Sequence, residues 1–292
     1  MTAAATEIDE LPWTAEYSPE SQARRPLKMI VDIGRDVWAG RELAWRLFVR
    51  NLSGSYRQSL LGFLWILVPT IAQAASWTFL SDQRILQFGT IPGGSFLAFI
   101  AIGSVLWQGF FDAVQTPLKT VLANQGLITK LQFPRESLVL VSLAEVLFDF
   151  LIRMIFVLVI CAFTGLSWSL GTLAVPVLMF GLILVGLALG LMLTPVGILY
   201  QDIGRTLTVL SPFWMLMTPV VYVAPDNPAY RIWNWINAPG ALLSASRDLL
   251  AAGTTDMWVP ALVWLAVALP LLLLGMMWFR LGFRIFIERM AN

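Results

Sequence analysis

Three ionisable residues are spaced four apart within one long apolar segment. Glu145, Asp149 and Arg153 would stack on one face of a helix over ~12 Å, at ~1.5 Å per residue. Ionised side chains at mid-membrane cost roughly 2.5 to 3.5 kcal/mol or more each, so they should face protein or water. Asp149 one turn before Arg153 is also the favourable order for an internal ion pair. The spacing predicts either a structural ion network that locks helices or two copies together, or the polar lining of a hydrated conduit.

Aromatic residues in the first two apolar segments form a second kind of candidate site. Indole rings stack on the apolar faces of sugars, and their N–H groups bond hydroxyls. Tryptophan is also common at both membrane interfaces, so an aromatic belt or core packing is the alternative. The candidates for stacking on a glycan are Trp65, Trp77, Trp107, Phe110 and Phe111.

The residues of several common catalytic sites are missing from the sequence. There is no histidine, and the one cysteine is Cys161. This excludes imidazole metal ligands, Ser/His and Cys/His nucleophilic pairs, and a disulfide within one chain. No Gly-Lys dipeptide occurs, so the chain has no phosphate-binding loop for ATP. We expect no enzyme active site, metal site or cofactor in this chain.

Six apolar stretches would position these residues. The hydrocarbon core is ~30 Å thick, so a helical crossing needs roughly 20 largely uncharged residues. The chain is 58% hydrophobic and 13% charged, with a mean hydropathy of +0.75. Because the stretches are continuous, helices are favoured over barrel strands. The sequence predicts an all-α integral membrane protein with six transmembrane helices, at about residues 60–81, 95–115, 138–164, 172–200, 207–223 and 257–279.

The distribution of charge predicts the orientation of these spans. Placing both termini in the cytoplasm puts most of the 19 lysine and arginine residues in the inner segments, as the positive-inside rule requires. Residues 1–20 contain five acidic residues and no basic one, which is unlike a signal peptide. We therefore expect a polar cytoplasmic tail over residues 1–36, and a transmembrane domain over residues 60–292 of a cytoplasmic, or inner, membrane.

Between tail and domain, residues 37–59 predict an amphipathic helix in the headgroup layer, because one face is apolar and another is basic. The apolar face holds Trp45, Phe48, Leu52 and Tyr56, and the basic face holds Arg46, Arg50 and Arg57. Two interpretations stay open. The segment is either a basic anchor that sets topology, or a helix that also meets a cytosolic partner or a lipid headgroup.

The longest inner loop, residues 116–136, combines apolar residues with few charges. A short helix bearing Leu127, Ile128 and Leu131 would expose a surface that favours a partner. Pro134 ends the element, because the residue before a proline is pushed out of helical geometry. The alternative is that these apolar residues pack beneath the protein's own spans.

The last outer segment, residues 224–256, predicts short helices that do not cross the membrane. It contains several prolines and tryptophans, followed by a stretch with helical potential that is too short to span and carries Arg247 and Asp248. A pair of re-entrant or interfacial helices fits this pattern. The alternative is an ordinary surface loop.

Three stretches occur in a distinctive order along these spans. They are residues 56–65 followed by Pro69, the loop 124–134, and Asp202-Ile203 with residues 218–222. Over about residues 40–292 they resemble the membrane subunits of type-2 ABC exporters, and most of all the polysaccharide, O-antigen and teichoic-acid export permeases. The resemblance implies a homodimeric permease that works with two copies of a separate cytosolic ABC ATPase subunit, which would bind ATP and magnesium.

The same resemblance implies where the ATPase would act and what would be moved. The amphipathic helix and the loop helix would contact the ATPase, with Tyr56 and Arg57 where the chain enters the membrane. The implied coupling residues are Asn124, Leu127, Ile128, Lys130, Phe133 and Pro134. The other implied partners are a lipid-linked glycan and membrane lipids, and nucleic acid is not among them.

Other functions fit parts of the pattern. One is a permease of the same superfamily that exports small hydrophobic compounds or drugs. Another is an ion-coupled secondary transporter that uses Glu145, Asp149 and Arg153, which would predict inverted repeats. A third is an intramembrane transferase, which would need a polar catalytic cluster at one membrane face.

Overall fold

A computed structural model describes most of the chain, namely residues 26–56, 59–83, 95–128, 130, 133–164, 170–200, 202–225 and 227–291. These residues form helices joined by turns and loops, with no strand among them. The elements are α1 (Pro26–Tyr56), η2 (Gly62–Ile66), α2 (Val68–Asp82), α3 (Phe96–Ala123), α4 (Gln125–Ile128), α5 (Glu136–Thr164), η3 (Leu170–Ala174), α6 (Val175–Leu199), α7 (Asp202–Met217), α8 (Pro228–Ile236), α9 (Ala238–Ala251) and α10 (Trp258–Ala291). The expected all-α class is confirmed for this part of the chain.

Three of the described helical segments are long and apolar enough to cross a membrane: Phe96–Ala123, Gly171–Leu199 and Trp258–Phe283. They coincide with the second, fourth and sixth spans expected from the sequence. The count of six spans and the cytoplasmic placement of both ends remain predictions.

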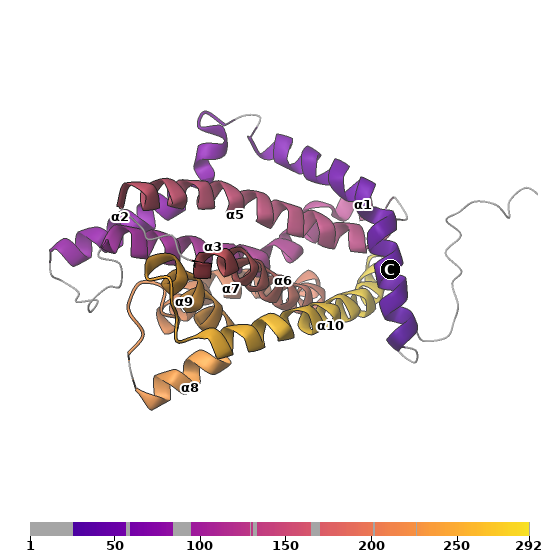
Figure 1. Ribbon diagram of the computed structural model, residues 1–292. Helices are drawn as coiled ribbons and strands as arrows, with labels where there is room; N and C mark the ends of the chain where they lie inside the picture. The colour runs from indigo at the N-terminus through magenta and orange to yellow at the C-terminus, as the bar shows by residue number, and fades with distance from the viewer. Residues whose placement is uncertain are drawn as a thin grey trace, which may run out of the picture.

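Helices α3, α5, α6 and α10 run alongside one another and form the bundle (Figure 1). The core lies around α3, whose side chains are almost all buried because it packs against α2, α5, α6 and α9. Glycines bring α6 close to it: a Cβ placed on Gly190 would lie 2.5 Å from the carbonyl oxygen of Val114. Small residues allow such close approach of two helix backbones in a membrane.

Two of the expected spans differ from the helices observed. The first, expected at 60–81, is broken into η2 and α2, because Gly62 has a φ of +52° and Pro69, which has no backbone N–H, lies at the start of α2. Helix α2 alone has 15 residues, or ~22 Å. The fifth, expected at 207–223, is α7, which ends at Met217 because Thr218 precedes Pro219.

Helix α1 begins at Pro26, so residues 26–36 belong to the helix and not to the expected polar tail. Figure 1 shows α1 beside the C-terminus, at one end of the bundle, with α2 and α8 at the other. Its packed face, against α5 and α10, includes Ala44 and Phe48. Trp45, expected on the same apolar face as Phe48, is 64% exposed, because packing on the bundle turns the Ala44 side of the helix inward.

Residues 224–256, expected on the outer side, form two short helices, as the sequence predicts. Helix α9 is nearly all buried and contacts α3, α6 and α10. Helix α8 keeps Ile232, Trp235 and Ile236 exposed. The bundle therefore surrounds one of the two helices and leaves the other at its surface.

Candidate functional site

Five polar residues from α1, α3 and α5, with the turn after α3, form what we call the loop network. The Arg50 guanidinium donates to the side-chain oxygen of Asn124 at 2.5 Å, and the Asn124 amide donates to the Thr120 carbonyl at 2.7 Å. The Asn51 amide donates to one oxygen of Glu145 at 2.8 Å, and the Thr120 hydroxyl donates to the other at 3.1 Å. The network thus brings together predicted residues from three separate segments.

Asn124 occupies the central position because it ends α3. It is the C-cap residue of that helix and is 1% exposed. The last carbonyls of a helix lack partners within the helix, and the Asn124 side chain binds one of them, at Thr120. Its oxygen remains available for Arg50. One amide side chain therefore caps α3 and attaches the cap to α1.

The loop is less exposed than its apolar sequence suggests. Leu127, Ile128 and Phe133 are half-buried and pack against the chain's own core, which is the alternative interpretation of this segment. Gly126 and Lys130 are exposed. Helix α4 is a single turn, Pro134 is half-buried, and Leu131 lies outside the described residues.

The other predicted basic residues of the interface helix differ in their surroundings. Arg46 forms an ion pair with Glu42 at 2.6 Å, with both side chains largely exposed. Such surface pairs contribute little to stability. Tyr56 is the last residue of α1, and Arg57 lies outside the described residues.

A second cluster, the Arg280 clamp, fastens α1 to the bundle. Arg280 of α10 forms ion pairs with Asp36 of α1 at 2.8 Å and with Glu136 of α5 at 3.0 Å. Glu136 lies ahead of the expected third span. Burial raises the pKa of the Glu136 carboxyl, and the neighbouring Arg280 charge opposes that rise. Sequence reasoning did not find this clamp, because its three members lie far apart along the chain.

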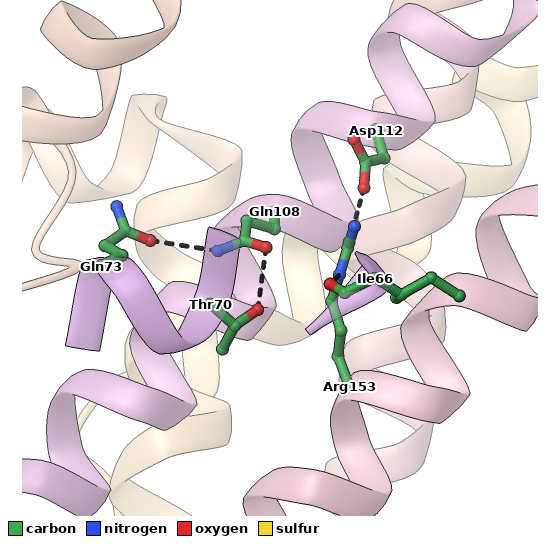
Figure 2. A network of polar contacts seen from close by, with 6 residues as sticks. All are labelled: Ile66, Thr70, Gln73, Gln108, Asp112 and Arg153. Atoms are coloured by element: carbon green, nitrogen blue, oxygen red, sulfur yellow. Dashed lines mark hydrogen bonds and ion pairs between the residues drawn. The ribbon is translucent and has the colours of Figure 1, made fainter. Parts of the chain in front are cut away.

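A third group, the mid-span network, lies deeper in the bundle (Figure 2). Arg153 of α5 forms an ion pair with Asp112 of α3 at 2.5 Å and donates to the Ile66 carbonyl at 3.2 Å. Arg153 forms no such ion pair with Asp149, and no ion pair of the described residues includes Asp149. Arg153 instead joins α3 and the end of η2, where it binds a carboxylate and a carbonyl at once.

The mid-span network continues through uncharged side chains (Figure 2). The Thr70 hydroxyl donates to the Gln108 oxygen at 3.0 Å, and the Gln108 amide donates to the Gln73 oxygen at 3.2 Å. The Gln73 amide contacts the Met215 sulfur of α7 at 3.0 Å. Sequence reasoning missed these residues and Asp112. The sequence did contain a signal for them, because these polar residues lie three or four positions apart inside apolar spans.

The predicted aromatic residues are mostly inside the core. Trp107, Phe110 and Phe111 are buried, and Phe110 meets Trp214 edge-to-face at 5.2 Å between ring centres. Their rings fill the space between α3 and α7, so none of the three offers a stacking face in one chain. The structure therefore supports the alternative of core packing for these three residues, and their stacking on a glycan stays a prediction. Trp77 is half-buried, and Trp65 is 54% exposed.

Near α9, a buried arginine holds the turn after α7. Arg247 donates to the Pro219 carbonyl at 2.7 Å, and its guanidinium lies 3.9 Å from the centre of the Phe99 ring. The Asn237 amide donates to the Thr218 hydroxyl at 3.0 Å. Residues 218–220, part of the stretch singled out in the sequence, are therefore fastened to α9 and α3.

Comparison with known proteins places most of the chain in one family. The profile of the ABC-2 type transporter family matches residues 42–251. An O-antigen export system permease protein RfbA from Klebsiella pneumoniae is 23% identical over 214 residues, covering 71% of this chain and 79% of the relative. A protein of the same name from Myxococcus xanthus is 25% identical over 193 residues, covering 66% of this chain and 73% of the relative.

Proposed function

The chain belongs to the ABC-2 type transporter family, a family of membrane subunits of transporters, and we propose that it exports a lipid-linked polysaccharide across the cytoplasmic membrane with a separate ATPase. It is an integral membrane transport subunit and not a catalytic one. The names of the similar permeases support a cargo of O-antigen type, and capsule or teichoic-acid glycans are the other candidates within the proposal.

The loop network carries the mechanistic part of the proposal. Arg50 connects Asn124 to α1, and Thr120 and Asn51 connect the same region to Glu145 of α5. A force on the loop would therefore reach two helices through hydrogen bonds alone. Hydrogen bonds that involve a charged group are the stronger ones, so Arg50 and Glu145 suit this role.

In the proposed cycle, two copies of the chain pair with two ATPase subunits. Closure of the ATPases around nucleotide pushes on the segment 124–134 and on α1. The loop network passes the displacement to α5, and a conduit opens between the two protomers. The glycan then moves outward along that path.

The loop assignment is tested by a substitution that blocks docking without disturbing the permease. Aspartate at Leu127 or Ile128 would confound the test, because both side chains pack on the core. Gly126 is exposed, and a Cβ there meets no described atom within 4 Å. Gly126→Trp should abolish co-purification of the partner ATPase and export, whereas Gly126→Ala should preserve both. Normal co-purification and export with Gly126→Trp would refute the assignment.

The source of energy is tested with the purified chain in vesicles. Alone, it should produce no uphill movement of cargo, because the proposal assigns ATP hydrolysis to another subunit. Uphill flux driven by an ion gradient, without any added ATPase, would favour the ion-coupled alternative and end the proposal.

A further inference from the structure

Two glutamines remain half-exposed in the middle of the bundle. Gln108 lies close to the midpoint of α3, the membrane-spanning segment Phe96–Ala123. Gln73 of α2 faces it and is also half-buried. Without hydrogen-bond partners in lipid, a polar side chain at this depth is costly, so such groups face protein or water-filled space. The exposed parts of these amides therefore mark a polar path or a protein contact.

The amides have hydrogen-bonding capacity that the described residues do not use. A glutamine side chain has two N–H donors and an oxygen with two lone pairs. Gln108 accepts one bond from Thr70 and donates one to Gln73. Gln73 donates only to the Met215 sulfur, and a thioether is a weak acceptor. Each amide can therefore take a further partner without breaking the bonds that join α2 to α3.

The charges around the two glutamines indicate which kind of chemical group they would bind. Gln73, Gln108 and Thr70 are neutral, and the nearest charge of the network, on Asp112, is paired with Arg153. The three side chains themselves therefore carry no charge that would attract an ion. A hydroxyl group both donates and accepts a hydrogen bond, as an amide does. Transport also requires sites that are weak enough to release what they bind.

We propose that Gln73 and Gln108 form a hydrogen-bonding subsite for the neutral hydroxyl groups of a sugar chain, on the side where α2 and α3 meet α7. This inference rests on the proposed function, because it identifies the part of the permease that contacts the glycan. It replaces the buried aromatic residues with two half-buried amides as the groups that the cargo meets.

The first experiment measures whether water reaches the two positions. The chain has one cysteine, Cys161, so Cys161→Ser allows single cysteines to be placed at residues 73 and 108. The full complex in membrane vesicles, supplied with ATP so that the proposed conduit opens, is treated with a charged, water-soluble methanethiosulfonate. Arg205→Cys, exposed at the start of α7, is the aqueous control, and Leu151→Cys, 59% exposed on α5, is the apolar one.

Positions 73 and 108 should react at rates close to that of residue 205. Rates as slow as that of residue 151 would overturn the subsite. Leu151 is the matched comparison because it is exposed at a similar distance along a helix but carries no polar neighbour in the mid-span network.

The second experiment measures export. Gln73→Leu and Gln108→Leu should each lower the export rate roughly fivefold, the effect of one lost hydrogen bond. The amount of permease that co-purifies with its ATPase should not change. Ser76→Ala is the control, since Ser76 is exposed on α2 and bonds only its own helix, at Ala72.

The outcomes separate this inference from the function on which it rests. Export at the wild-type rate by the double variant would overturn the subsite and leave the exporter intact. If the wild-type complex moved no glycan, the proposed function would fail first. A lower export rate that followed only from loss of assembled complex would assign the glutamines to helix packing and also overturn the subsite.

Discussion

The guanidinium of Arg50 lies 2.5 Å from the side-chain oxygen of Asn124, although the two residues are 74 positions apart in the sequence. Arg50 belongs to the interface helix α1, and Asn124 caps α3 at the start of the loop. The segment proposed to receive force from an ATPase is therefore directly bonded to the helix proposed to lie at the membrane surface.

Asn124→Leu should reduce export while the partner ATPase still binds. The substitution removes the acceptor for Arg50 and the donor to Thr120, and a hydrogen bond to a charged group contributes ~1.5 to 3 kcal/mol. Asn124→Asp keeps the acceptor for Arg50 and adds an opposite charge but loses the donor to Thr120, so it should retain more export than Asn124→Leu. The ratio of export to ATP hydrolysis distinguishes the variants, and equal ratios would contradict the role of the loop network.

Arg153→Met should destabilise the protein, because it leaves the half-buried Asp112 without its ion-pair partner. Removing one member of a fully buried pair costs about 3 to 5 kcal/mol, and the partial exposure of Asp112 should make the loss smaller than that. Adding Asp112→Asn should recover most of the loss. The fraction of protein that stays soluble after heating in detergent is the measurement. Asp149→Asn is the control and should cost less, since Asp149 is outside the ion pairs of the described residues.

Arg280→Met should loosen α1 and make stability depend on pH. Burial raises the pKa of Glu136 above its ordinary value of 4.5, and Arg280 restrains that rise. A carboxyl whose pKa is raised by folding contributes stability below its unfolded pKa and loses it as pH rises through its folded pKa. Without Arg280 the pKa of Glu136 in the folded protein rises further, so more stability is lost as the pH increases.

The matched variant for this prediction is Arg280→Met with Glu136→Gln, which removes the titrating group. Melting temperatures of the two variants should agree at low pH and diverge as the pH rises, with the single variant less stable. Identical curves across the pH series would mean that Glu136 does not titrate as described. Limited proteolysis after Arg35 and Arg41 reports the loosening of α1.

Gly190→Ala should destabilise the contact between α3 and α6. The added Cβ would lie 2.5 Å from the Val114 carbonyl oxygen, and overpacking typically costs ~1 to 3 kcal/mol. Gly34→Ala is the matched control within α1, where a Cβ meets nothing within 4 Å. That change should instead stabilise the helix by ~0.5 to 1 kcal/mol. Thermal stability in detergent should therefore move in opposite directions for the two variants.

Local sequence patterns predicted the helical class and the longest helices well. A continuous apolar run forms a helix wherever the backbone must satisfy its own hydrogen bonds, so the segments Phe96–Ala123, Gly171–Leu199 and Trp258–Phe283 could be read from the sequence. The break at Gly62 and Pro69 also had a local signal, because glycine and proline restrict helix geometry in known ways. The prediction of one continuous span over 60–81 did not take this glycine and proline into account.

Membership in a transporter family, the all-helical class and the segments that carry polar residues were determined by the sequence alone, because each depends on residues near one another along the chain. Only the tertiary structure decided that Arg153 pairs with Asp112 and not Asp149, and that Trp107 and Phe110 pack in the core. It also placed Arg50, Asn124 and Glu145 in one network. These outcomes depend on which helix faces meet, and a buried charge binds whichever opposite charge the packing brings within reach.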